Sequence, residues 1–163
     1  MEGAQNKITT NQEMSVKQIL VVDDSSSWLH FVRGLLELKA EFNVIATATN
    51  GTEAIEKARE LQPNVVLMDL GLPGMNGFEA TRQIRQISPA SKIVFLSEQR
   101  DSDLIEAAFQ AGGMGYILKS DSYFDLLAAI GFILRDRRFV SHSLRIGATP
   151  RIRALLERDG DGR

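Results

Sequence analysis

The sequence contains no cysteine among its 163 residues. This absence excludes disulfide bonds, thiol catalysis and cysteine-based zinc sites, and it suits a reducing compartment. No apolar run approaches the ~18 residues of a membrane span. Residues 1–15 are polar and lack the apolar core of a secretory signal. We therefore expect a soluble cytoplasmic protein.

The sequence also has little excess charge of either sign. Its formal net charge is -2, which gives no overall reason to expect nucleic-acid or membrane binding. Hydrophobic residues make up 44% and charged residues 25%, as in an ordinary globular protein, and the length fits one domain with tails. Residues 1–15 are rich in Gln, Asn and Thr without any hydrophobic period, so we expect a disordered lead there.

Short apolar runs alternate with stretches of helical hydrophobic period five times along the chain. The runs predict strands at residues 17–22, 43–48, 64–68, 92–96 and 115–118, and the stretches predict helices near 28–36, 54–61, 77–87, 103–111 and 123–135. Strict alternation implies a parallel sheet with helices on both faces and right-handed crossovers. At this size we expect an α/β, flavodoxin-like, doubly wound five-stranded sheet in the order 2-1-3-4-5.

The third predicted strand ends in an aspartate, within the stretch VVLMDLGLPG at residues 65–74. A Gly/Pro turn follows at once, which places Asp69 at the carboxyl end of the strand. In open α/β sheets, ligands bind at this edge. Taken alone, Asp69 is either a helix cap or loop residue, or part of a site.

The other predicted strand ends also carry reactive or charged groups, namely Asp23, Asp24, Ser97 and Lys119. In the expected strand order these residues share one edge with Asp69. Carboxylates that lie close together repel unless a cation sits among them, and their oxygens suit Mg²⁺. An aspartate beside such a cation and a lysine can attack phosphorus and form an aspartyl phosphate. Each residue alone has an ordinary interpretation as a cap, a loop hydroxyl or a solvated lysine, but their joint placement favours a site.

At these residues the chain resembles the receiver domain of two-component response regulators, of the chemotaxis-receiver type. The resemblance rests on VVDDS at 21–25, VVLMDLGLPGMNGFE at 65–79, IVFLS at 93–97 and GYILK at 115–119. It covers residues 16 to about 136, and we place the receiver domain at 16–138. The sequence most resembles the receivers of regulators that carry a C-terminal helix-turn-helix, a module that we do not find in this sequence.

The resemblance implies a role for each residue of the acidic edge. It makes Asp69 the phosphoacceptor. It makes Asp23, Asp24 and Asp69, with the backbone carbonyl of Gly71, the groups that hold Mg²⁺. The donor would be a sensor histidine kinase or a histidine phosphotransfer protein. The protein would then be a signalling module rather than an enzyme, with at most self-catalysed phosphoryl transfer and autodephosphorylation.

The resemblance also implies a switch. Ser97 would follow the phosphoryl group on activation, Lys119 would pair with it, and Tyr116 would turn inward. The face formed by the fourth helix, fifth strand and fifth helix would then change its affinity for a partner, including a second copy of the chain. Glu98 follows Ser97 where the family often has a small residue, and we predict that it alters access to the phosphoryl group or its lifetime.

Three aromatic or imidazole side chains lie outside these motifs. Trp28 is near the start of the first predicted helix and lies either beside the acidic pocket or packed at the surface. His30 and His142 are isolated in the sequence, and neither has metal-ligand spacing to another histidine. We interpret both histidines as structural or surface residues.

Residues 139–163 are predicted to form a basic, partly helical tail. Residues 148–157, ATPRIRALLE, faintly resemble the opening of a helix-turn-helix module. A partner-docking segment and the remnant of a lost or truncated output domain are the alternatives to a solvated tail. We identify no recognition helix for a major groove, so we expect that this chain alone does not bind DNA.

Three other functions compete with the receiver. A flavin-binding electron carrier on the same fold would need hydroxyl- and glycine-rich phosphate turns after the first strand, where this chain has Asp23 and Asp24. A phosphatase or phosphomutase that uses an aspartyl phosphate typically has its nucleophile on the first strand, whereas Asp69 is on the third. A receiver-like interaction module that no longer takes phosphate would not need the intact set of aspartates and lysine.

Overall fold

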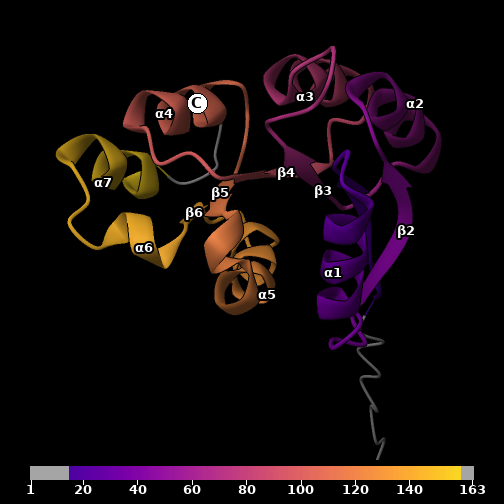
Figure 1. Ribbon diagram of the computed structural model, residues 1–163, viewed down its shortest axis with the longest axis horizontal. Helices are drawn as coiled ribbons and strands as arrows, with labels where there is room; N and C mark the ends of the chain where they lie inside the picture. The colour runs from indigo at the N-terminus through magenta and orange to yellow at the C-terminus, as the bar shows by residue number, and fades with distance from the viewer. Residues whose placement is uncertain (1–14, 159–163) are drawn as a thin grey trace, which may run out of the picture.

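The structure, a computed structural model, describes residues 15–158 and contains one parallel sheet with helices on both faces (Figure 1). The strands are β1 (Lys17–Val22), β2 (Phe42–Ala48), β3 (Val65–Asp69), β4 (Lys92–Ser97), β5 (Gly115–Leu118) and β6 (Phe139–Val140). Their order is β2-β1-β3-β4-β5-β6. The doubly wound α/β class is confirmed, and so is the order of the first five strands.

The expected number of strands is wrong, because the sheet has a sixth strand. Phe139 pairs with Gly115 and Val140 with Tyr116, both in parallel register. The Ser141 hydroxyl extends this pairing by accepting the backbone N–H of Leu118 at 2.7 Å. Two residues are too few to show a hydrophobic period, so β6 could not be predicted from local pattern. This strand lies immediately beyond the domain boundary expected at residue 138.

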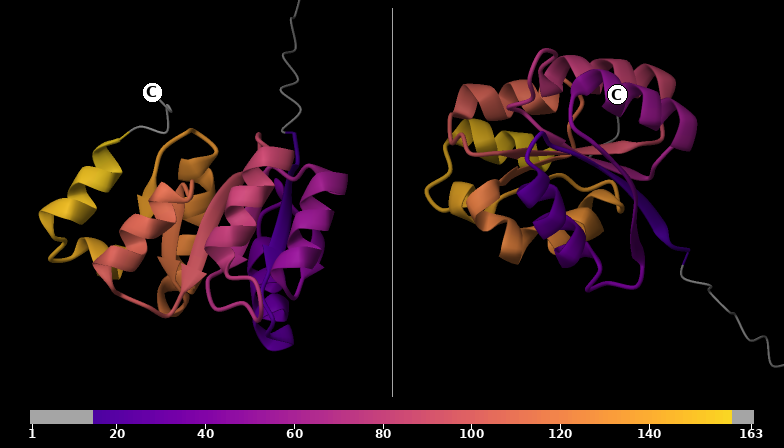
Figure 2. Two further views of the ribbon diagram at one scale, coloured as in Figure 1. Left: turned by 90° about the horizontal axis from the view of Figure 1, so that it is seen from above. Right: turned by 45° about the vertical axis from the view of Figure 1, so that its right-hand side comes forward.

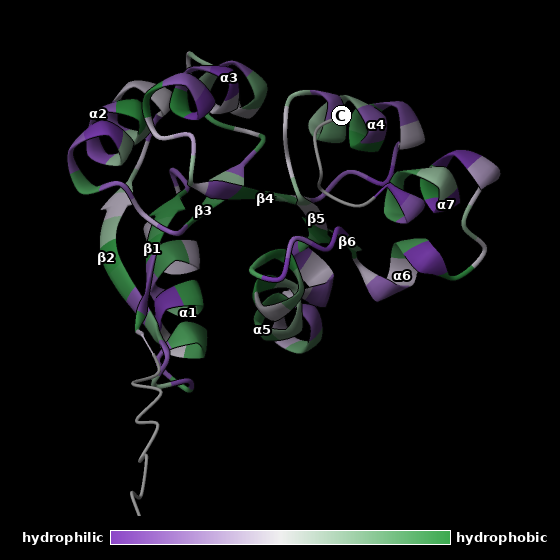
Figure 3. Cartoon of the chain, turned by 180° about the vertical axis from the view of Figure 1, so that it is seen from behind, coloured by the Kyte–Doolittle hydropathy of each residue, from purple (hydrophilic) through white to green (hydrophobic). Residues whose placement is uncertain are grey.

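The helices divide into two layers (Figure 2). They are α1 (Ser26–Leu36), α2 (Gly51–Leu61), α3 (Gly77–Ile87), α4 (Ser102–Gln110), α5 (Ser122–Ile133), α6 (His142–Arg145) and α7 (Pro150–Glu157), with a 3₁₀ turn η1 at Lys119–Asp121. Side chains of α1 and α5 form one core cluster with one face of the sheet. Side chains of α2, α3, α4, α6 and α7 form the other cluster. Figure 3 shows the same division as apolar helix faces turned toward the sheet.

Cap residues fix where several helices begin. The side chains of Ser25, Asn50 and Asn76 accept backbone N–H groups in the first turns of α1, α2 and α3. Asp121 occupies the cap position of α5, but its side chain makes no cap hydrogen bond. Its carboxylate accepts the backbone N–H and the hydroxyl of Ser143 instead. A long-range contact has therefore replaced a local one.

The C-terminal part of the described chain packs on the domain. Beyond β6, α6 and α7 place Leu144, Ile152 and Leu155 in the core cluster that also holds side chains of α4. None of the helices in residues 15–158 is long and apolar enough to cross a membrane. The expected disordered lead lies outside the described residues except for Ser15, as do residues 159–163 of the expected tail.

Candidate functional site

The carboxyl edge of the sheet brings the predicted site residues together. Asp23 follows β1, Asp69 ends β3, Ser97 ends β4 and Lys119 follows β5. Because β1 and β3 are neighbours, the carboxylates of Asp23, Asp24 and Asp69 each place an oxygen within 4.8 Å of the others. Asp23 and Asp69 are buried, whereas Asp24 is exposed.

Lys119 is the cation of this edge. Its Nζ lies 2.7 Å from Asp23 Oδ2 and 3.5 Å from Asp69 Oδ1. Burial lowers the pKa of Lys119, but the hydrogen bond to Asp23 and the attraction of Asp69 outweigh burial and place the pKa above its usual value. The ammonium group therefore stays charged at neutral pH. Its position between two strand ends lets it contact Asp23 and Asp69 together.

Asp69 carries a charge that its surroundings do not fully offset. Burial raises the pKa of Asp69; the Gly71 N–H opposes the rise, repulsion from Asp23 adds to it, and Lys119 opposes it. The Gly71 N–H donates to Asp69 Oδ1 at 3.1 Å. The net shift is upward, so further positive charge at this point would favour the ionised form.

The loop after Asp69 returns close to its backbone. Gly74 adopts a φ of 76°, which favours glycine. A Cβ on Gly77 would lie 2.7 Å from the Asp69 carbonyl oxygen, so only glycine allows this approach. These two glycines bring the start of α3 against the end of β3, and they explain the turn that the sequence predicted at residues 70–76.

The acidic cluster fits a hard divalent cation by the chemistry of its donors. Its three carboxylates are oxygen ligands of the kind that Mg²⁺ uses, and Asp24 is open to solvent. Asp23 is held in place, because its Oδ1 accepts the Ser25 N–H at 2.9 Å while Lys119 binds its other oxygen. The cluster is therefore partly preorganised and lies where water ligands could reach it.

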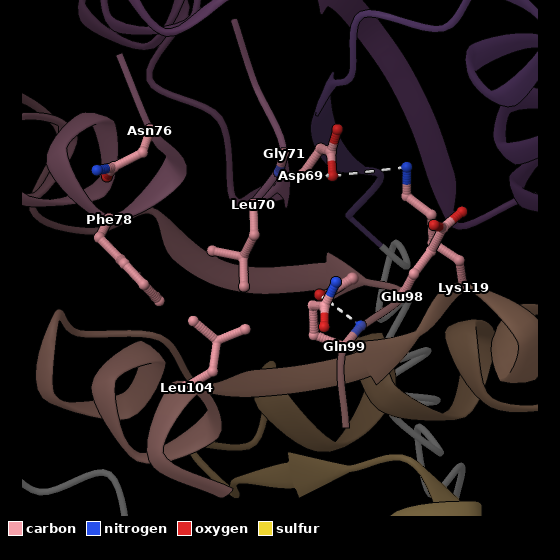
Figure 4. Close-up of a pocket in the computed structure, with 10 residues that line it drawn as sticks. Asp69, Leu70, Gly71, Asn76, Phe78, Glu98, Gln99, Leu104 and Lys119 are labelled. Carbon is pink, nitrogen blue, oxygen red and sulfur yellow. Dashed lines mark hydrogen bonds and ion pairs between the residues drawn. The ribbon is translucent and has the colours of Figure 1, made fainter. Parts of the chain in front are cut away.

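A cavity of about 490 Å³ opens beside Asp69 (Figure 4). Its lining comes from the carboxyl ends of β3, β4 and β5 and from the first turns of α3 and α4: Asp69, Leu70, Gly71, Asn76, Phe78, Ser97, Glu98, Gln99, Leu104 and Lys119. Glu98 is exposed at this cavity. Glu98 and Asp69 therefore line the same cavity.

Ser97 and Tyr116 both contact Gln99. The Ser97 hydroxyl accepts the Gln99 N–H at 3.0 Å, and the Tyr116 hydroxyl donates to the Gln99 carbonyl at 2.8 Å. Tyr116 is fully buried. Burial raises the pKa of Tyr116, with the nearby Ser97 hydroxyl opposing the rise. The Tyr116 side chain thus points inward in the same structure in which the Ser97 hydroxyl contacts the loop between β4 and α4.

Trp28 lies beside the site, which sequence alone left undecided. The Lys119 Nζ is 5.0 Å from the Trp28 ring centroid, a cation–π distance. Trp28 also stacks on Phe31 with ring centroids 5.2 Å apart. As the only tryptophan, it is positioned to report changes at Lys119.

A second cluster of titratable groups was missed by sequence reasoning. Asp121, Asp125 and His142 gather where η1 and the start of α5 meet α6. Asp125 Oδ2 lies 2.8 Å from both the backbone N–H and the ring Nδ1 of His142. These contacts tie His142 to the start of α5. Its partners are 17 and 21 residues away and are brought to it by β6, so local patterning carried no signal of them.

Comparison with known proteins identifies the class. The family model of the response regulator receiver domain matches residues 19–131, and the chain belongs to that family. Receiver domains are generally signalling modules of two-component systems that bind Mg²⁺ at an acidic pocket and are phosphorylated on an aspartate. The flavin carrier and the phosphomutase are therefore set aside.

Individual relatives agree with this assignment. The chain is 42% identical over 113 residues to the transcriptional regulatory protein LnrK of Bacillus subtilis, covering 69% of this chain and 51% of LnrK. It is 33% identical over 153 residues to the nitrate/nitrite response regulator NarL of Escherichia coli, covering 92% and 70%. The chain thus spans about half the length of LnrK.

A solved structure is similar as well. A LuxR-family two-component response regulator from Aurantimonas sp. SI85-9A1 superposes with a TM-score of 0.77 at 38% identity, over 81% of this chain and 94% of that one.

Proposed function

We propose that this chain is a phosphoacceptor receiver that takes a phosphoryl group onto Asp69 from the phosphohistidine of a sensor kinase or phosphotransfer protein. The observation that carries the proposal is the position of Lys119 Nζ, 2.7 Å from Asp23 and 3.5 Å from Asp69, at the mouth of the 490 Å³ cavity. A nucleophile, a cation and room for a phosphoryl group meet there, and the family assignment supports the same chemistry.

Mg²⁺ would be held by Asp23, Asp24, Asp69 and the backbone carbonyl of Gly71. When bound, it would neutralise charge on the phosphoryl oxygens and on the acidic cluster. The upward pKa shift of Asp69 supports this assignment, because a bound cation would favour the ionised form that burial and repulsion from Asp23 disfavour.

The residues of the chain supply positioning and charge. An oxygen of Asp69 attacks phosphorus in line, the P–O bond to Asp69 forms, and the P–N bond to the donor imidazole breaks. The imidazole leaves as a neutral group once a proton has been supplied to the departing nitrogen. Lys119 neutralises one phosphoryl oxygen, and the Ser97 hydroxyl donates a hydrogen bond to another. The same site can transfer the phosphoryl group to water, which is autodephosphorylation.

The output would be a population shift of the face made by α4, β5 and α5. In the described structure the Ser97 hydroxyl contacts Gln99. A phosphoryl group on Asp69 would compete for that hydroxyl and move the β4–α4 loop. The changed face would then bind a partner protein or a second copy of the chain. A cytoplasmic location fits this role, and DNA binding by this chain alone is not part of it.

The test is intact-mass analysis after incubation with Mg²⁺ and acetyl phosphate. We expect one added phosphoryl group on the wild-type chain, none on Asp69→Ala, and none in EDTA. A phosphorylated histidine phosphotransfer protein should label the same residue faster. An unlabelled wild-type chain under conditions that label another receiver would contradict the proposal and favour the pure interaction module.

A further inference from the structure

Helix α7 covers the outer side of α4 (Figures 1 and 2). Ile152 and Leu155 of α7 are 5% and 9% exposed, and they share a core cluster with Ile105 and Phe109 of α4. Helix α7 thus adds two apolar side chains to the cluster that buries α4. The contact therefore has a hydrophobic centre, the kind of surface that stabilises helix docking.

Charged groups frame this apolar centre. The Arg151 guanidinium donates to Asp103 at 2.7 Å and also pairs with Glu106, both on α4. These pairs are exposed, so they set the register of α7 more than its stability. On the inner side, Arg138 Nη1 donates to the Leu155 carbonyl at 3.0 Å. The α4 surface thus fits a short basic amphipathic helix, and α7 has that pattern.

The same α4 helix begins directly after the loop that follows Ser97. Asp101 caps α4 by accepting the N–H groups of Asp103 and Leu104. Two residues earlier, Gln99 is held by Ser97 and by Tyr116. A change at Ser97 therefore reaches the first turn of α4 through one short loop, while α7 is tied to Arg138 beside β6. Movement of α4 alone would strain the contact with α7.

We propose that the outer face of α4 is a docking surface whose resident occupant is α7, and that phosphorylation of Asp69 loosens α7 from it. The inference rests on the proposed function of Asp69. Docked α7 favours the arrangement in which Ser97 contacts Gln99, and the phosphoryl group favours the arrangement in which Ser97 contacts its oxygens. Because such coupling is reciprocal, docked α7 also opposes phosphorylation.

Hydrogen exchange of the full chain tests the first direction. With Mg²⁺ and acetyl phosphate, amides of residues 151–157 should exchange at least about fivefold faster, the lower end of typical allosteric coupling. In Asp69→Ala they should not change. A phosphorylated chain, verified by mass, with unchanged exchange in α7 would overturn the docking inference while leaving the phosphoacceptor intact. A chain that takes no phosphoryl group would instead contradict the proposed function.

Two substitutions in α7 test the reverse direction. Ile152→Ser removes apolar contact with α4 and should speed labelling of Asp69 by about fivefold. Arg151→Ala removes the pairs with Asp103 and Glu106 and should give a smaller increase in the same direction.

Arg153→Ala is the matched control, because Arg153 is an exposed residue of the same helix and the charge change is equal. It should label at the wild-type rate. Equal rates in all three variants would overturn the proposal. If Ile152→Ser lowers the amount of folded protein, Arg151→Glu, which places like charges against α4, gives the same test without altering the core.

Discussion

The two acidic clusters of this domain contain three members each, and their surroundings differ in one respect. In the cluster of Asp121, Asp125 and His142, hydrogen bonds from the chain satisfy the carboxylates: Ser143 donates twice to Asp121, and the His142 backbone donates to Asp125. In the cluster of Asp23, Asp24 and Asp69, Asp24 is exposed and Asp69 faces a cavity.

The difference separates a structural from a chemical role. Buried carboxylates that accept backbone N–H groups fix one conformation, because removal of either partner leaves an unsatisfied group. Carboxylates that repel each other beside open space retain free lone pairs for a cation or a phosphoryl group. Aspartates occur in both clusters, so the presence of aspartate alone does not determine the role of a cluster, and the groups around the carboxylates do.

The basic side chains that contact the aspartates of the two clusters, Lys119 and His142, provide the largest test of this contrast. Lys119→Ala should lower the rate of Asp69 labelling by about 100-fold, as loss of one preorganised charge donor does in other active sites. His142→Ala should leave that rate within about twofold. Rates come from intact-mass time courses with acetyl phosphate. Similar losses in both variants would remove the distinction between the clusters.

The contrast reverses when stability is measured. Asp125→Ala leaves the part-buried His142 N–H without its acceptor and should lower the free energy of unfolding by about 2 kcal/mol. Asp24→Ala removes an exposed carboxylate and should change it by less than about 0.5 kcal/mol. Urea unfolding in EDTA measures both. An equal loss of stability in Asp24→Ala and Asp125→Ala would contradict the assignment of a chemical rather than a structural role to the cluster of Asp23, Asp24 and Asp69.

Burial gives Asp69 a stability cost that depends on pH. Burial raises the pKa of Asp69 above its value in the unfolded chain. The protonated carboxyl therefore contributes stability below the unfolded-state pKa, and this contribution to stability is lost as the pH rises through the folded-state pKa. In EDTA at pH 7, Asp69→Asn should therefore be more stable than wild type by on the order of 1 kcal/mol. Urea unfolding should show the gain shrinking on acidification; a gain that grows instead would give the shift the wrong sign.

Glu98 offers the smallest test, because it is exposed at the cavity and its field is screened. Glu98→Gln removes a negative charge near the phosphoryl group and should speed labelling and slow dephosphorylation by about twofold, less at high salt. Glu56→Gln, an exposed residue of α2 with the same charge change, is the control. An unchanged dephosphorylation rate in Glu98→Gln would show that Glu98 does not influence the lifetime of the phosphoryl group.

The five longer strands and the polar residues at their ends could be predicted from local sequence pattern. Residues 65–68 are a continuous apolar run because β3 is buried on both faces, and a run of that kind is visible without coordinates. Asn50 and Asn76 cap helices through hydrogen bonds three residues away, which local sequence also reveals. The acidic edge followed from strand order, since parallel strands end on the same side.

Features that depend on partners distant in the sequence could be identified only from the folded chain. Strand β6 exists because β5 offers an open edge, and it carries His142 to Asp125 and α7 to α4. In the same region the Asp121 carboxylate accepts the Ser143 hydroxyl and does not cap α5, and the Tyr116 hydroxyl donates to the Gln99 carbonyl. Such pairings join residues 17 or more apart, where hydrophobic period and cap chemistry carry no information. They form only when the sheet has brought the partners within a few ångströms.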